Sequence, residues 1–271
     1  MSSSCQPWQQ FAPLYAAAPG KVIFDDDLLG HGLQLLASNS GGEAQLAYWG
    51  LPNVGGVPSV PSGWTAAQLA NHPGIAYCQT AALHDKGSLT FSGLEIATTG
   101  QYGFWPLFSI GPGMLWSCIF ATPNVLSTAA DRYRFAVGLG CLNSLSTGLD
   151  GPAYLYYSDN VNGGHWVLAE GLAAAEGDNV TIANSQVAPV PGTWNRLEVY
   201  KPANSKSLSA YLNGQFLCQG NGFIGNDPMP APGGGGMWMV RDTFTSGTIT
   251  AFMDRISLRM LNEVDGCTSQ F

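Results

Sequence analysis

The segment from 193 to 220, TWNRLEVYKPANSKSLSAYLNGQFLCQG, restricts the fold of this chain more than any other part of it. Apolar residues occupy every second position in two runs: Leu197 and Val199, then Leu208, Ala210 and Leu212. Asn213-Gly214 follows the second run and supplies two residues that tolerate positive φ, as a type I′ turn requires. The segment predicts half-buried antiparallel strands joined by a tight hairpin that leads into Phe216 and Cys218.

Two further segments alternate with the same period. RYRFAVGLG (132–140) puts four apolar side chains opposite its arginines: Tyr133, Phe135, Val137 and Leu139. SLTFSGLEI (88–96) changes phase at Ser92-Gly93, which predicts a β-bulge at Gly93. Strands of this kind, separated by turn formers, are typical of a β-sandwich.

The segment near the C-terminus, TITAFMDRISLRML (248–261), also predicts a strand with one apolar face. We expect Phe252, Ile256, Leu258 and Met260 on that face, with Arg255, Ser257 and Arg259 on the other. Asp254 shares the apolar phase, so we expect it to be hydrogen-bonded or to lie near a sheet edge, because an unpaired buried carboxylate is costly.

The composition supports one all-β domain. The 271 residues include 35 Gly and 17 Pro, which favour tight turns over long helices. All-β sandwiches commonly reach about 200–250 residues as one unit. We therefore expect an extended N-terminal arm at 1–20, a sandwich at 21–262 and a C-terminal tail at 263–271.

The charges exclude several partners. Only 10% of residues are charged and the net charge is −8, which argues against nucleic acid because phosphate binding needs clustered Lys and Arg. Residues 96–130 carry no charge, but Gly and Pro interrupt them repeatedly, so no membrane insertion is expected. The N-terminus does not resemble a secretion signal, which predicts synthesis in a reduced cytoplasm.

Neither the cysteines nor the acidic residues predict a metal site. The six cysteines contain no C-x-x-C pair, and Cys118 and Cys218 are expected to be buried as small hydrophobic residues, while disulfides cannot be decided from spacing. Asp25, Asp26 and Asp27 would point alternately to opposite faces of a strand, which does not assemble a Ca²⁺ site. No cofactor is expected.

Several pieces of the chain, spread over residues 24 to 259, resemble the concanavalin-like (laminin-G-like) jelly-roll domains of bacteriophage virion proteins. The matching pieces are FDDDLL (24–29), HPGI (72–75), RFAVGLG (134–140), GPAYLYYSDNVNGGHW (151–166), GTWNRLEVYKPANSKSLSAYLNGQFL (192–217) and MDRISLR (253–259). The resemblance implies a concanavalin-like antiparallel β-sandwich. It implies little about a ligand, because one fold hosts many functions.

Three kinds of function remain open for such a sandwich. Retaining glycosidases need two carboxyl groups about 5–5.5 Å apart, and no E-x-D-x-E pattern occurs, so no catalytic residue is predicted. A glycan hydrolase or lyase is the least favoured function. A lectin module is the alternative, with Tyr154, Tyr156 and Trp166 as a possible glycan surface, although Leu155 and Tyr157 share one face and indicate that part of this cluster is core.

The favoured function is a non-enzymatic virion component, either a capsid decoration (cement) protein or part of a tail attachment organelle. Its expected partners are other virion proteins and further copies of itself, with a surface glycan as a possible ligand. The uncharged arm is expected to serve assembly through four spaced apolar anchors: Trp8, Phe11, Leu14 and Tyr15.

Overall fold

The structure is a computed structural model that describes ten stretches of the chain. They are 21–26, 35–36, 44–46, 49–51, 76–83, 86–91, 113–142, 149–171, 179–222 and 235–261. The predicted arm at 1–20, the bulge at Gly93 and the tail at 263–271 lie outside these stretches.

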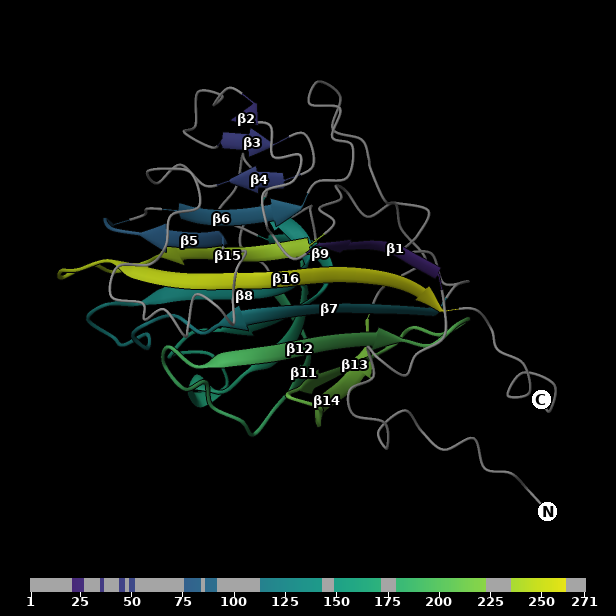
Figure 1. The fold of residues 1–271 in the computed structure, drawn as a ribbon. Helices are drawn as coiled ribbons and strands as arrows, with labels where there is room; N and C mark the ends of the chain where they lie inside the picture. Colours follow the sequence, from purple (N-terminus) through teal and green to yellow (C-terminus); the bar gives the residue numbers. More distant parts are fainter. Residues whose placement is uncertain are drawn as a thin grey trace, which may run out of the picture.

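Two antiparallel sheets make up the molecule, stacked one behind the other (Figure 1). Sheet A has the strand order β1-β16-β7-β12-β13-β14, and β5 also pairs with β16. Its strands are β1 (Lys21–Asp26), β5 (Ala76–Thr80), β7 (Gly113–Ala121), β12 (Trp194–Lys201), β13 (Ser207–Leu212), β14 (Gln215–Asn221) and β16 (Ile249–Leu261).

Sheet B has the order β11-β10-β9-β8-β15-β6-β4-β3-β2. Its strands are β2 (Leu35–Leu36), β3 (Ala44–Leu46), β4 (Trp49–Leu51), β6 (Lys86–Phe91), β8 (Tyr133–Leu142), β9 (Leu149–Tyr157), β10 (Val167–Gly171), β11 (Asn179–Asn184) and β15 (Gly235–Arg241). Within the described stretches the one helical element is a 3₁₀ turn, Asn162–Gly164. The predicted all-β sandwich is thereby confirmed.

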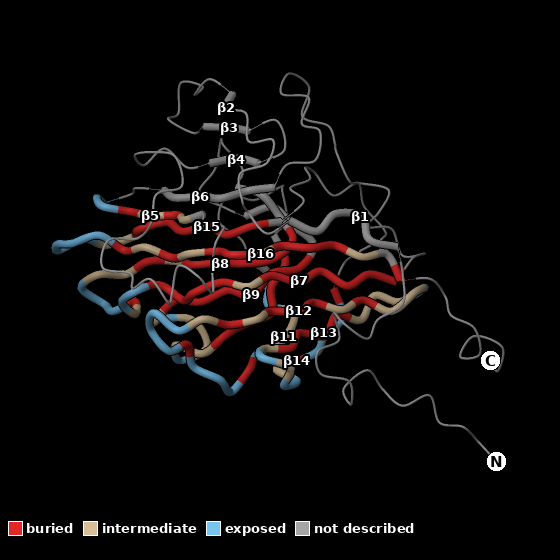
Figure 2. Tube along the Cα trace, in the orientation of Figure 1, coloured by how far each residue is buried: buried red, intermediate tan, exposed pale blue. Residues whose placement is uncertain are grey.

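The core lies between the sheets and is built from the apolar phases that the sequence predicts. Tyr133, Phe135, Val137 and Leu139 of β8 meet side chains of sheet A in one continuous cluster. Sheet A contributes Trp116, Cys118, Leu197, Val199, Leu208, Ala210, Ile256 and Leu258. Figure 2 shows this buried interior running along the central strands of both sheets, with the exposed segments gathered in the turns.

The predicted hairpin is present. β13 and β14 pair antiparallel, and Asn213 and Gly214 have φ values of 54° and 76°, as a type I′ turn requires. The Asn213 side chain accepts a hydrogen bond from the Arg196 backbone N–H (2.8 Å) and donates one to Asn195 Oδ1 (3.0 Å). The turn is therefore tied to β12 as well as to its own strands.

The expected face of β16 needs one correction. The register between β16 and β7 shifts between Met253 and Arg255, so a β-bulge at Asp254 changes which phase points inward. Met253, not Phe252, joins the core, while Ile256 and Leu258 face inward as expected. Asp254 is buried on a central strand, at the gap between the segments of β16 that pair with β5 and with β1.

The central strands of sheet B, β8, β9, β10 and β15, are buried on both faces. Their outward phase forms a second buried cluster of Ala136, Tyr154, Tyr156, Val167, Ala169, Trp238 and Val240. On the outward phase of sheet A, Leu115, Tyr211 and Leu261 form a third buried cluster, and the arginines beside it are partly exposed. Among the described residues, no helix is long and apolar enough to cross a membrane.

Candidate functional site

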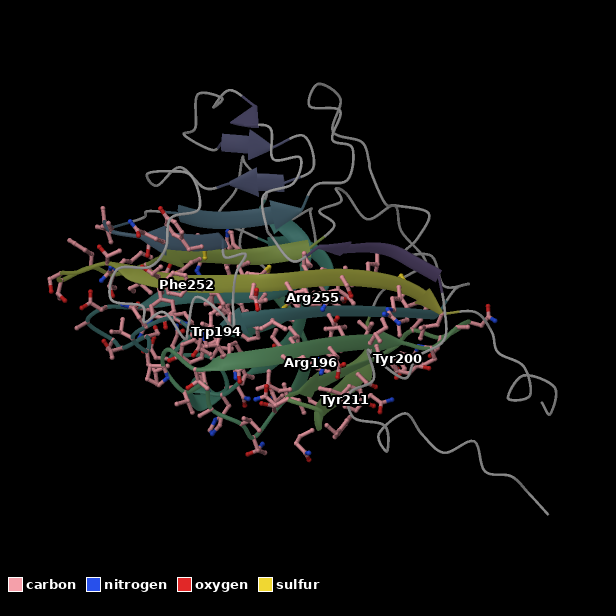
Figure 3. The ribbon with its side chains drawn as sticks, in the orientation of Figure 1. Trp194, Arg196, Tyr200, Tyr211, Phe252 and Arg255 are labelled. Atoms are coloured by element: carbon pink, nitrogen blue, oxygen red, sulfur yellow. The ribbon has the colours of Figure 1, made fainter. Side chains whose placement is uncertain are left out.

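The outer face of sheet A gathers charged, hydroxyl and aromatic side chains from four adjacent strands, and we call it the arginine face. Because Leu197 and Val199 point into the core, their neighbours on β12 point outward. The same alternation applies to β7, β13 and the part of β16 after the bulge. The arginine face comprises Ser117, Trp194, Arg196, Glu198, Tyr200, Tyr211, Phe252, Arg255, Ser257 and Arg259, of which Figure 3 labels six along the visible side of the sheet.

A buried carboxylate lies at the centre of the arginine face. Glu198 pairs across the ladder with Ser117 of β7 on one side and with Tyr211 of β13 on the other. Ser117 in turn lies opposite Ser257 of β16, and the two hydroxyls are hydrogen-bonded at 3.1 Å. The row Ser257–Ser117–Glu198–Tyr211 therefore forms a polar floor across four strands.

The tyrosine of this row keeps its proton. Burial is the main cause that raises the pKa of Tyr211, the negative charge of Glu198 also raises it, and a hydrogen bond with Ser209 acts in the opposite direction. Its ring also packs edge-on against Phe216, with centroids 5.7 Å apart. Tyr211 is thus a neutral phenol held in place by an aromatic neighbour.

Arginines flank the polar floor. Arg196 and Arg255 both pair with Ile119 of β7, so they lie on the same cross-strand row, about two interstrand spacings or 10 Å apart. Arg259 lies on the next row beyond the floor, which also holds Tyr200. The Arg196 guanidinium is 3.6 Å from Glu198, and its side chain is 32% exposed while that of Glu198 is fully buried.

Aromatic side chains border the arginine face at the end where β12 begins. Trp194 and Phe252 both pair with Ala121, so they lie on one row, and both are partly exposed. Guanidinium groups bind carboxylates and sulfates through directed N–H bonds, while aromatic faces pack against the apolar faces of sugar rings. The arginine face can therefore bind an extended ligand that carries both anionic and apolar surfaces.

A second polar region lies at one end of the sandwich, and we call it the loop end. It consists of loops 81–83, 122–132, 158–166, 185–193 and 242–248. They meet because β7 ends opposite the start of β12 and β15 ends opposite the start of β8.

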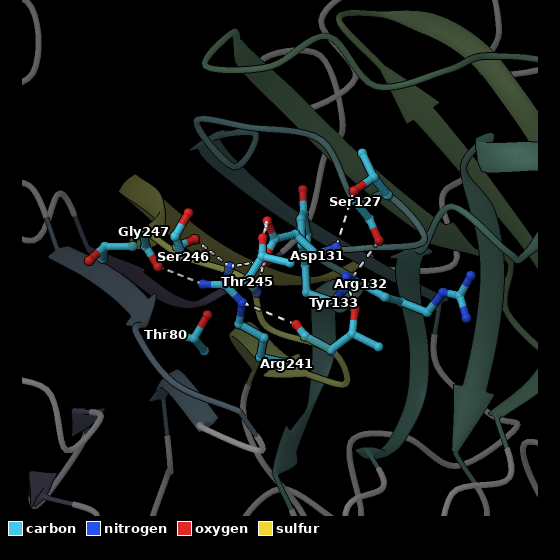
Figure 4. Close-up of polar contacts among 12 residues, drawn as sticks. Thr80, Ser127, Asp131, Arg132, Tyr133, Arg241, Thr245, Ser246 and Gly247 are labelled. Atoms are coloured by element: carbon cyan, nitrogen blue, oxygen red, sulfur yellow. Dashed lines mark hydrogen bonds and ion pairs between the residues drawn. The ribbon is translucent and has the colours of Figure 1, made fainter.

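The loop end is organised around the buried Arg241 (Figure 4). Arg241 donates to Asp131 Oδ1 (2.6 Å) and to the backbone carbonyls of Ser246 (3.0 Å) and Gly247 (2.8 Å). Asp131 also accepts hydrogen bonds from the backbone and hydroxyl of Thr245, which are the main cause of its lowered pKa, with Arg241 contributing. These contacts join loop 122–132 to loop 242–248.

A second ion pair closes the same region. Arg132 donates two hydrogen bonds to Asp159 (3.0 and 3.1 Å), and the Ser127 hydroxyl donates to the same carboxylate (2.6 Å). The Arg132 bond is the main cause that lowers the pKa of Asp159. Every polar group in this network bonds to another part of the chain, which indicates a structural role.

The residues predicted as a glycan surface lie inside the protein, which corrects that prediction. Trp166 is in the main core, with ring contacts to Phe120 and Tyr157 at centroid distances of 6.1 and 5.8 Å. Tyr154 and Tyr156 belong to the buried cluster on the outer side of sheet B. The two-residue period of the sequence predicts that these tyrosines point away from the main core. It does not predict that the outer side of sheet B is also covered.

The other predicted residues fall into two groups. Trp8, Phe11, Leu14 and Tyr15 lie outside the described residues, and their assembly role stays a prediction. Cys118 and Cys218 are buried free thiols, as expected, and burial raises the pKa of Cys218 to about 11. No cluster of metal-ligating side chains is found among the described residues.

The sequence predicts the polar strand faces that form the arginine face, but only the strand order shows that they are neighbours. WNRLEVY and RISLR each alternate polar and apolar residues, so each predicts an outward face. The two faces become one surface because β7 lies between β12 and β16. Strands so far apart in sequence reveal their neighbours only in the folded chain.

Comparison with known proteins supports the fold and no closer relationship. No known protein-family model and no curated protein matches the sequence. Among solved structures, a protein of unknown function from Shewanella oneidensis MR-1 matches with a TM-score of 0.50 and 13% identity, covering 94% of this chain and 97% of that one. The Emp46p carbohydrate recognition domain gives a TM-score of 0.45 at 13% identity, covering 82% and 97% of the two chains. Trypanosoma rangeli sialidase gives 0.41 at 15% identity, covering 86% of this chain and 31% of that one.

Together, the two antiparallel sheets and their shared core define an antiparallel β-sandwich.

Proposed function

We propose that this chain is a non-enzymatic, lectin-like binding module and that its arginine face binds a glycan bearing carboxylate groups. The observation that carries the proposal is the cross-strand arrangement of Arg196, Arg255 and Arg259 around a polar floor. These three are half of the six arginines in a chain of net charge −8. Arginine side chains gathered on one face favour an anionic ligand, and guanidinium groups suit carboxylates.

The aromatic border supports a sugar over a simple anion. Trp194 and Phe252 are partly exposed, and Tyr200 lies in line with Arg259. A polymer of uronic acids offers both groups that this surface requires, namely carboxylates and the apolar faces of sugar rings. The ligand-binding residues under this proposal are Trp194, Arg196, Tyr200, Phe252, Arg255 and Arg259.

The setting that we propose for this binding is a virion. The resemblance to phage virion domains of HPGI (72–75) and the Tyr-rich segment (151–166), in combination with the 192–217 segment, supports it, together with the low fraction of charged residues. The chain would then decorate the capsid or form part of a tail attachment organelle, beside other virion proteins, after synthesis in the host cytoplasm. Immunogold electron microscopy of purified particles tests the setting, and particles without label would contradict it.

Binding is tested with the full chain and a defined polymer. Polygalacturonate should retard the protein in affinity gel electrophoresis, and neutral dextran should not. Replacing both Arg196→Gln and Arg255→Gln should weaken polygalacturonate binding at least about tenfold, since each charge-assisted hydrogen bond contributes about 1.5–3 kcal/mol. Each arginine is also replaced alone, and Lys206→Gln is the matched control for these single variants, because it removes one positive charge outside the arginine face.

Three results would count against the proposal. Equal retardation by dextran would show that binding does not depend on the carboxylates. Unchanged binding in the double variant would place the ligand elsewhere. Shortening of the polymer, or formation of unsaturated sugars, would show that the protein is an enzyme.

A further inference from the structure

The loop end exposes a group of large apolar side chains. Six large hydrophobic side chains are exposed among the described residues, and five of them lie on this end. We call them the apolar rim: Leu83 (51% exposed), Val125 (46%), Val187 (43%), Val190 (60%) and Phe244 (39%). Single exposed hydrophobic residues are ordinary, but five on the loops of one end mark an interaction surface.

The backbone beneath the apolar rim is held in place. The carbonyl of Val125 accepts a hydrogen bond from the Tyr133 hydroxyl (2.6 Å), and that of Val187 accepts one from the Trp166 backbone N–H (2.9 Å). The carbonyl of Val190 accepts bonds from the Thr122 hydroxyl and from the Thr193 backbone. Binding through these residues would therefore cost little ordering entropy.

The side chain of Phe244 is also held. The Arg241 guanidinium lies over its ring, 4.6 Å from the centroid, and this arginine is itself bonded to Asp131. The ring is thus presented to solvent from a rigid base.

Charge at the loop end cancels. Arg132 pairs with Asp159 at 3.0 Å, Arg134 with Asp242 at 2.9 Å and Arg241 with Asp131 at 2.6 Å. The described residues of these loops carry no other Lys, Arg, Asp or Glu. The net charge of −8 therefore belongs to other parts of the chain.

The neutral charge of the loop end favours a second copy of this chain as the partner. Two copies of an acidic protein repel each other over most of their surfaces, and the loop end is a place where they can meet without like charges facing one another. An apolar, neutral surface is also complementary to itself, as a two-fold symmetric contact requires. An anionic membrane is disfavoured, because the arginines of this end are already paired with aspartates.

We propose that a second copy of this chain docks on the apolar rim, loop end to loop end, and forms a two-fold symmetric dimer. The arginine faces of both copies stay open in this dimer, so a polymeric ligand can engage two of them at once. Dimerisation does not depend on glycan binding and is tested without any glycan.

The test is sedimentation velocity of the full chain over a range of protein concentrations. A concentration-dependent dimer is expected, and Val187→Asp with Val190→Asp should raise its dissociation constant at least tenfold, because the new charges face their counterparts in the partner. Gln215→Asp with Asn221→Asp adds the same two charges at exposed positions of β14, outside the rim, and should leave the dissociation constant unchanged. Raising NaCl to 0.5 M should not dissociate the dimer, since the contact is apolar.

The proposal is overturned if the chain remains a monomer at every concentration or if the Asp variants dimerise as well as the original. It is also overturned if salt dissociates the dimer, which would assign the contact to ion pairs. Flotation with phosphatidylcholine vesicles supplies a further arm, in which vesicle binding lost in the Asp variants, from a monomeric protein, would assign the rim to lipid. Unchanged circular dichroism of the variants checks that they are folded.

Discussion

The six arginines of this chain divide equally between two regions with opposite chemistry. At the loop end, Arg132, Arg134 and Arg241 each hold an aspartate in a short ion pair, and Arg241 is buried. On the arginine face, the side chains stand in rows on a sheet surface, and Arg196 is 3.6 Å from the buried Glu198. The same type of side chain fastens loops in one place and lies partly exposed on the outer surface of a sheet in the other.

We expect the largest loss of stability from removing the Arg241 contacts at the loop end. Arg241→Met should lower the free energy of unfolding by about 3 kcal/mol, because it leaves the carbonyls of Ser246 and Gly247 and the Asp131 carboxylate without their buried donor. Chemical denaturation measures the change. Polygalacturonate binding by the folded variant should be unaffected, and a loss of binding would show that the two regions are coupled.

The hairpin at Asn213-Gly214 supports the arginine face, because the Asn213 side chain is hydrogen-bonded to the backbone of Arg196. Gly214→Val should destabilise the sandwich by more than about 1 kcal/mol, since a β-branched residue resists positive φ. Thermal denaturation measures this effect. Gly214→Asn is the control, because Asn tolerates that conformation and should cost much less.

Acid should weaken the loop end. The pKa values of Asp131 and Asp159 are lowered in the folded chain, so their stabilising contribution is complete above about pH 4, the unfolded value. It is lost as pH falls through the lowered folded values. In Asp131→Asn the melting temperature should lie below that of the original chain at pH 7, and the gap should narrow below pH 4. A gap that is constant with pH would show that the carboxylate charge is not the cause.

The smallest expected effect is on the arginine face itself. Arg255→Gln should change the free energy of unfolding by no more than about 0.5 kcal/mol, because the side chain is partly exposed. Denaturation run beside the Arg241 variant measures the contrast. A loss comparable to that of Arg241→Met would mean that Arg255 is structural and would remove the distinction between the two regions.

The sequence by itself determined the inward faces of the strands. The two-residue period in RYRFAVGLG places Tyr133, Phe135, Val137 and Leu139 in the core, and Asn213-Gly214 forms the turn that its residue types require. Both signals are local, since backbone geometry fixes which side chains share a face and which residues accept positive φ. The burial of Cys118 and Cys218 follows from the same pattern.

Only the tertiary structure decided what covers each outward face. Tyr154 and Tyr156 leave the core face as the period predicts, yet they are buried because the outer side of sheet B is covered as well. The bulge at Asp254 moves Phe252 outward, and the order β16-β7-β12 brings Arg255 and Arg196 to one row. Strand order and sheet coverage depend on contacts between distant segments, and a two-residue period contains no information about which segments meet.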